Sequence, residues 1–143
     1  MIIPDINLLV YAHNDAAPGH AAARAWWESC LNGNVPVGLP WVVVAGFLRL
    51  MTHPRVLERP MAVAAAVAHV RAWLDQPPAR IIHPGEKFEG IFLGYLEQLG
   101  TAANLTTDAQ LAALAVEHQA VLCSNDTDFA RFPGLRWTNP LKR

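Results

Sequence analysis

The chain has 143 residues, of which 52% are hydrophobic and 16% are charged, and its formal net charge is −1. These values predict a single globular domain over residues 1–143 and exclude intrinsic disorder, which requires low hydrophobicity and high net charge. The near-neutral charge also argues against a module that binds nucleic acid over a broad basic face, so any such contact should be local.

The N-terminal half of the chain begins with a predicted strand. Met1–Ile3 is a short apolar run that ends at Pro4-Asp5, and a second apolar run, Ile6–Ala12, follows immediately. This pattern indicates a buried strand that carries Asp5 at its end. Apolar residues at helical spacing then predict two helices, His20–Leu31 and Trp41–Thr52.

The C-terminal half alternates helical segments with strands. The alanine- and valine-rich stretch Pro60–Leu74 precedes an amphipathic helix predicted over Glu86–Leu99. Thr107-Asp108-Ala109-Gln110 matches a capping box, which predicts that Thr107 caps a helix running through Ala109–His118. Three further strands are expected, Ala79–His83, Ala120–Ser124 and an edge strand at Leu135–Thr138.

The alternation of strands and helices predicts an α/β fold with a mostly parallel sheet and helices on both faces, because parallel strands need crossover connections. Ligands of such sheets bind beyond the carboxyl ends of the strands. Asp5 follows the first strand, and Asp126 and Asp128 follow the strand Ala120–Ser124. Asp108 opens the preceding helix. We therefore expect these carboxylates to meet at one rim of the sheet.

An acidic rim of this kind is a candidate metal site. Carboxylate oxygens are the ligands that Mg²⁺ or Mn²⁺ prefers, and a water on such an ion loses its proton more easily and attacks a phosphodiester. Ser124 and Asn7 are candidates to hydrogen-bond the acids or a water, and Arg49 is a candidate partner for Asp5 or a phosphate.

Structural roles compete with this interpretation. Asp108 alone is more often a first-turn acid that complements the helix dipole, and Asp126 and Asp128 alone are more often turn residues. Asp5 is harder to explain in this way, because a buried charge without a partner is costly. The supporting residues have alternatives too: strand-end capping for Ser124, turn stabilisation for Asn7, and extension into solvent for Arg49.

Other function classes lose their best evidence. The sequence contains no Gly-x-Gly-x-x-Gly motif, no phosphate-binding loop and no Gly-x-Ser-x-Gly elbow. A receiver-like or phosphatase protein shares such a sheet and acidic rim, but Lys87 and Lys142, the only lysines, do not follow a late strand. Zinc is not expected, because the histidines form no His-Glu-x-x-His arrangement.

Location and redox state follow from composition. No apolar run approaches the roughly 18 residues of a membrane helix, and the N-terminus lacks the basic start of a signal peptide. We therefore expect a cytoplasmic protein with no membrane partner. Cys30 and Cys123 lie far apart in apolar contexts, so two buried thiols are expected in preference to a disulfide or a metal pair.

Three segments carry a family resemblance: Met1–Ala12, Asn104–Ala115 and Ser124–Leu135. Together, in this order, they resemble the PIN domain and specifically its VapC-type toxin ribonucleases. The resemblance implies a three-layer α/β/α sandwich that holds magnesium or manganese on acidic residues and cleaves single-stranded RNA. It also implies a homodimer and inhibition by a VapB-like antitoxin. By motif, Asp5, Asp108 and Asp126 match the family acids, with Asp128 a near neighbour.

One position departs from the family pattern. Many PIN domains carry a glutamate on the second predicted helix, where this sequence has Gly46 followed by Phe47-Leu48-Arg49. Some VapC-like branches resemble this variant. The departure leaves open the number of metal ions and whether water or Asp128 replaces the missing ligand. It also leaves an alternative function, a catalytically weak PIN-like module that binds RNA or protein.

Partner surfaces are expected on the most apolar helices. The Trp26-Trp27 helix and the Trp41–Leu50 helix together offer an apolar face for the antitoxin, whose basic side chain could extend toward the acids. Gly90-x-x-x-Gly94 is interpreted as helix packing first and as a dimer contact second. Candidate basic groups for RNA are Arg49, Arg55, Arg59, Arg131 and Arg136.

Overall fold

The computed structural model describes residues 1–142 and contains a parallel five-stranded sheet in the order β3-β2-β1-β4-β5. The strands are β1 (Ile2–Pro4), β2 (Val37–Pro40), β3 (Ala79–Ile82), β4 (Val121–Cys123) and β5 (Trp137–Thr138). The α-helices are α1 (Ile6–His13), α2 (His20–Leu31), α3 (Trp41–Met51), α4 (Val63–Leu74), α5 (Phe88–Leu99) and α6 (Thr106–Glu117). Two 3₁₀ turns are η1 (Ala103–Leu105) and η2 (Thr127–Arg131).

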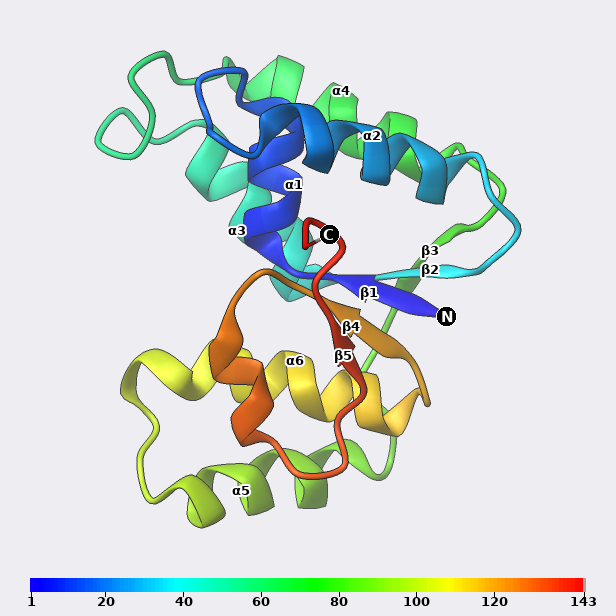
Figure 1. Cartoon of the computed structure of the whole chain (residues 1–143), viewed down its shortest axis with the longest axis vertical. Coiled ribbons are helices and arrows are strands. Elements are labelled where there is room, and N and C mark those ends of the chain that lie inside the picture. Colours follow the sequence, from blue (N-terminus) through cyan, green and yellow to red (C-terminus); the bar gives the residue numbers. More distant parts are fainter. Residues whose placement is uncertain (143) are drawn as a thin grey trace.

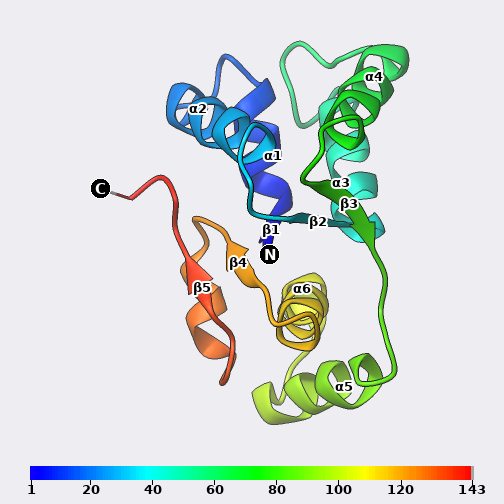
Figure 2. The same cartoon turned by 90° about the vertical axis from the view of Figure 1, so that its right-hand side faces the viewer.

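The helices form two layers around the sheet. Helices α1 to α4 cover one face and α5 and α6 cover the other (Figures 1 and 2). This arrangement confirms the predicted α/β/α sandwich. None of the helices in residues 1–142 is long and apolar enough to cross a bilayer.

Helix α1 begins directly after β1 without a loop. Asp5 has an extended backbone and caps the helix, since its side chain accepts a hydrogen bond from the Ile6 N–H. Leu8, Leu9 and Val10 are buried. The sequence pattern did not assign this helix, because its residues are almost uniformly apolar and show no helical period.

Strand β2 was also absent from the expected elements. All four of its residues are buried, so it lacks the apolar–polar alternation that marks a half-exposed strand. Gly38 allows close packing here, because a Cβ at this position would lie 2.9 Å from Met1 Sδ and 3.1 Å from Ile82 Cδ1. The strand is therefore specified by contacts with distant residues.

The predicted capping box at Thr107 is wrong. Helix α6 begins at Thr106, directly after η1, and Leu105 occupies the cap position without a side-chain cap. The 3₁₀ turn continues into the helix, so no side-chain oxygen is needed where Thr107 stands. The last strand is also shorter than expected, since β5 covers only Trp137–Thr138.

The apolar surface expected to span α2 and α3 is interrupted, and part of it is buried. Helix α1 lies between these two helices and packs against both (Figure 2). Trp27 is 3% exposed, and Val43 and Phe47 of α3 are fully buried, so the core uses the apolar residues predicted to receive a partner. Trp26 stays partly exposed, in line with one core ring and one surface ring.

The two cysteines and the α5 glycines complete the comparison with expectation. Cys123 is buried, Cys30 is partly buried, and both are free thiols, as predicted. Burial raises the pKa of Cys30 to about 11 and that of Cys123 to about 12, so both stay protonated. Gly90 and Gly94 face open space, which contradicts their preferred interpretation as packing residues within the chain.

Candidate active site

The pairing of β1 with β4 brings the first acid to the late polar turn. Pro4 lies opposite Cys123 in this parallel pair, so the residues that follow, Asp5 and Ser124, emerge side by side. The Asp5 N–H donates to the Cys123 carbonyl oxygen at 2.8 Å, which extends the pairing by one residue. The carboxyl edge of the sheet therefore holds Asp5 in a fixed place.

Asp5 is a buried carboxyl group, with 6% of the residue exposed. Its Oδ1 accepts from the Ile6 N–H at 2.7 Å, and its Oδ2 accepts from the Ser124 hydroxyl at 2.7 Å. Burial raises the pKa of Asp5, the two hydrogen bonds oppose that rise, and the charge of Asp126 adds to it. Asp5 is thus a hydrogen-bonded acid whose charged form is disfavoured by burial and by the charge of Asp126.

Ser124 connects the acids to one another. It is fully buried, donates to Asp5, and accepts from the Asp126 N–H at 2.9 Å. Its carbonyl accepts from Trp137 Nε1–H at 3.0 Å, and its own N–H donates to the Thr138 carbonyl. Ser124 therefore caps the strand end and also sets the distance between the first acid and the late turn.

Three other acids converge beside Asp5 and Ser124. Asp108, Asp126 and Asp128 each offer a carboxylate oxygen, and these oxygens all lie within 4.8 Å of one another. Asp126 caps η2 by accepting from the Asp128 N–H at 2.9 Å. In residues 1–142 this acid trio is the only such group of three potential ligands.

Asp108 carries the electrostatic cost of this convergence. Its pKa is raised to about 6, first by burial and then by the charges of Asp126, Asp5 and Asp128. Like charges held together in this way favour a bound proton or a bound cation. Because the donors are hard oxygens, they fit Mg²⁺ or Mn²⁺ better than a thiolate- or imidazole-preferring metal.

Distant contacts hold the helix that supplies Asp108. At the other end of α6, the Glu117 carboxylate accepts from the Gly85 N–H at 2.7 Å and the Lys87 N–H at 2.9 Å. His118 Nε2 also pairs with the His83 carbonyl oxygen at 2.9 Å. These bonds attach α6 to the segment between β3 and α5 and so fix its axial position relative to the sheet.

The predicted supporting residues fall into two groups. Asp128 and Ser124 are part of the acidic assembly described above. Asn7 and Arg49 are exposed, and within residues 1–142 their side chains form neither a hydrogen bond nor an ion pair. The structure therefore does not bring Arg49 into an ion pair with Asp5.

Gly46 lies where the family pattern has a glutamate, and its surroundings explain the glycine. It is buried, and a Cβ here would lie 2.5 Å from Ile6 Cδ1 and 3.0 Å from Ile6 Cγ1. The Ile6 side chain fills the space a longer residue would need. Ile6 directly follows the first acid, Asp5. Because Ile6 and Gly46 are far apart in the sequence, the sequence alone did not reveal their contact.

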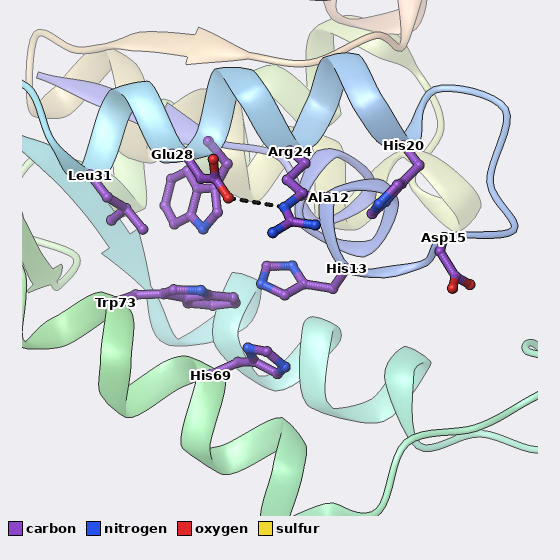
Figure 3. Close-up of a pocket in the computed structure, with 10 residues that line it drawn as sticks. Ala12, His13, Asp15, His20, Arg24, Glu28, Leu31, His69 and Trp73 are labelled. Atoms are coloured by element: carbon purple, nitrogen blue, oxygen red, sulfur yellow. Dashed lines mark hydrogen bonds and ion pairs between the residues drawn. The ribbon is translucent and has the colours of Figure 1, made fainter.

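A polar cavity that motif reasoning missed lies between α1, α2 and α4 (Figure 3). It has a volume of about 490 Å³ and is lined by His13, His20 and His69. Burial lowers the pKa of His13, with smaller contributions in the same direction from His69, His20 and Arg24. His13 Nδ1–H donates to the Leu9 carbonyl at 2.7 Å. Because three separate elements supply these histidines, no sequence motif marks the cavity.

Comparisons with known proteins agree with this architecture. The PIN domain family model matches residues 2–135. Ribonuclease VapC33 of Mycobacterium tuberculosis is 50% identical over 142 residues, which are 99% of each protein. The crystal structure of M. tuberculosis VapC20, a sarcin-ricin loop cleaving toxin, matches with a TM-score of 0.70 and 19% identity, covering 95% of this chain and 99% of that one.

A complex also shares the fold. VapBC2 from Rickettsia felis, solved bound to a DNA fragment from its promoter, matches with a TM-score of 0.68 at 22% identity and covers 97% of this chain and 98% of the other. The family model and the 50% identical relative each extend over nearly the whole sequence. The chain therefore belongs to the PIN-domain family and, within it, to the VapC proteins.

Proposed function

We propose that this protein is a divalent-metal-dependent endoribonuclease that cleaves single-stranded regions of RNA as the toxin of a type II toxin–antitoxin pair. The observation that carries the proposal is the convergence of Asp108, Asp126 and Asp128 next to the buried Asp5. The 50% identity to a relative named as a ribonuclease supports the same activity.

In this proposal Asp5, Asp108 and Asp126 hold the cation, preferably Mg²⁺ with Mn²⁺ as an alternative, and Asp128 takes the place of the missing glutamate. A bound divalent cation would neutralise phosphate charge and lower the pKa of a water. Ser124 positions Asp5 relative to Asp126 through its two hydrogen bonds. The acids are therefore arranged before any ligand arrives, which lowers the cost of binding it.

Substitution of single acids tests the assignment. Asp108→Asn and Asp5→Asn should each remove most cation binding and most cleavage of a labelled single-stranded RNA, because amide oxygens are weaker ligands for a hard cation. Asp75→Asn, at an exposed acid after α4, is the matched control and should behave like the parent protein. A folded Asp108→Asn protein that cleaves normally would overturn the metal site.

A second function keeps the fold and loses turnover. Helix α3 supplies no acid, because Gly46 packs against Ile6 at the usual glutamate position. In this alternative the protein is a PIN-like module that binds RNA or protein. A magnesium titration with RNA present separates the two functions: binding without cleavage at any metal concentration would support the module.

We further propose a VapB-like antitoxin and a second copy of this chain as partners. The first is supported by the fold shared with a VapBC complex. The second is supported by α5, where Gly90 and Gly94 face open space and Leu93 is 47% exposed. Mass measurement in solution tests the homodimer, and loss of cleavage on adding the antitoxin encoded beside the gene tests the inhibitor.

A further inference from the structure

Helix α3 presents one narrow exposed face. Trp41, Ala45 and Arg49 are exposed, whereas Val43 and Phe47 are fully buried on the opposite side. Residues four apart lie above one another on a helix, so the three exposed residues form a single line. We call this line the α3 stripe. It consists of an aromatic ring, a small residue and a cation.

Trp41 is exceptional among the aromatic residues. It is 55% exposed, and in residues 1–142 it is the only aromatic among the large exposed hydrophobic side chains. Trp27 and Trp73, by contrast, are each 3% exposed and pack against one another. The core therefore accounts for the indoles of Trp27 and Trp73, whereas no aromatic ring in residues 1–142 packs against Trp41.

Strand register places Trp41 at the same edge of the sheet as the acids. Ile2 lies opposite Val37 in the β1–β2 pair, which sets Asp5 level with Pro40, each three residues further along the chain. Neighbouring strands are about 4.8 Å apart, so Trp41 follows a residue adjacent to Asp5. The α3 stripe therefore starts at the same edge of the sheet as the candidate active site.

Arg49 gives the stripe its charge. It lies two turns beyond Trp41, about 12 Å along the helix axis. Arg24–Glu28 is the only ion pair in the part of the chain the structure describes, so no acid in residues 1–142 neutralises Arg49. On a protein of net charge −1, this is a cation available to an anionic ligand.

We propose that Trp41 and Arg49 form a subsite for single-stranded RNA, in which the indole stacks on an unpaired base and the guanidinium pairs with a backbone phosphate. This inference rests on the proposed function and extends it to substrate binding. An exposed ring two helical turns from a cation suits a single strand, because the bases of a single strand expose their faces, whereas those of a duplex are covered by stacking. It also meets the expectation that a near-neutral protein contacts nucleic acid locally.

Binding measured without cleavage tests the subsite. With EDTA present, a labelled single-stranded RNA of mixed sequence should bind Trp41→Ala about tenfold more weakly than the parent protein, and Trp41→Phe should retain most of the affinity. Arg49→Ala should weaken binding and reduce the slope of log K against log salt by about 0.7, the value for one phosphate contact on a single strand. Arg71→Ala, at an exposed arginine on α4, is the matched control.

Kinetics and mass separate the alternatives. With Mg²⁺, Trp41→Ala should lose kcat/KM mainly through a rise in KM. Equal affinity of Trp41→Ala and the parent protein, or equal binding of duplex and single strand, would overturn the subsite. A Trp41→Ala protein that changes from dimer to monomer would instead assign the α3 stripe to contact between copies.

The outcomes for the subsite and the nuclease are distinct. If the parent protein binds single-stranded RNA through Trp41 and never cleaves it, the subsite stands and the nuclease assignment fails. If the parent protein cleaves and Trp41→Ala binds and cleaves equally well, only the subsite fails.

Discussion

Helix α1 has an ionisable group at each end, and the two ends accommodate that group differently. At the N-terminal end, burial and the charge of Asp126 raise the pKa of Asp5, and the pKa of Asp108 nearby is raised to about 6. At the C-terminal end, burial lowers the pKa of His13, which packs edge-on against Phe47 and His69. Both environments disfavour charge, but only at the acidic end do the oxygens of three carboxylates, those of Asp108, Asp126 and Asp128, lie within 4.8 Å of one another.

This difference distinguishes the acidic end, which suits a ligand, from the histidine end, which suits a neutral side chain. His13 donates one ring N–H to the Leu9 carbonyl and packs against the rings of Phe47, His69 and Trp73, so its surroundings favour the neutral imidazole. The acids cannot all ionise without repulsion unless a cation joins them. We therefore assign chemistry to the acidic end and stability to the histidine end.

The largest expected effects come from one substitution at each end. Asp108→Asn should reduce cleavage at least 100-fold while raising the melting temperature of the metal-free protein, since it removes a repelled charge. His13→Ala should do the reverse, destabilising by about 1–3 kcal/mol through lost ring packing while preserving cleavage per folded molecule. RNA cleavage and thermal unfolding measure both. A loss of cleavage in folded His13→Ala would break the division between the ends.

Cation binding should be visible at the acidic end alone. Millimolar Mg²⁺ or Mn²⁺ should raise the melting temperature, because a ligand present at 100 times its Kd stabilises the folded state by about 2.7 kcal/mol. The shift should vanish in Asp108→Asn and persist in His13→Ala. An unchanged melting temperature in the parent protein would count against a formed site.

The acidic rim was predictable because its residues follow local rules. Carboxylates after strands of a parallel sheet must share an edge, and this placed Asp5 and Asp126 together. Asp128 joins them through a local turn. The layer order was equally accessible, since alternating strands and helices permit few arrangements.

The missed features depend on residues far apart in sequence. Strand β2 has no pattern of its own and is defined by its packing against Met1 and Ile82. The histidine cavity combines α1, α2 and α4, none of which carries a motif. The apolar faces of α2 and α3 were assigned to a partner because such a face looks the same in sequence whether the core or a partner covers it. The place where an antitoxin binds stays a prediction.

Substitutions at Gly46 and Ile6 test why helix α3 supplies no acid to the acidic end. Gly46→Ala should destabilise by about 1–3 kcal/mol, because its Cβ would overlap the Ile6 side chain. Combining it with Ile6→Ala should cost less than the sum of the two single changes. A double-mutant cycle in denaturant measures this coupling. Additive costs would show that Ile6 does not determine the glycine.

The smallest expected effect is a pH dependence of opposite sign at the two ends. His13 has a folded pKa below its ordinary 6.5, so the unfolded state binds protons more readily and stability is lost as pH falls through 6.5. Asp108 has a folded pKa of about 6 against an ordinary 3.8, so its contribution is fully present below 3.8 and is lost as pH rises through 6.

Single variants resolve the two contributions. Between pH 7 and pH 5 in EDTA, the melting temperature of Asp108→Asn should fall on acidification, because of the two contributions to stability only that of His13 remains. His13→Gln should gain melting temperature over the same range, each change being on the order of a few degrees. In His13→Gln, Mg²⁺ should reduce the rise in melting temperature that Asp108 produces on acidification, since the cation and the proton compete for the same carboxylates. A gain on acidification that survives in Asp108→Asn would assign the titration to another group and remove the contrast between the two ends of α1.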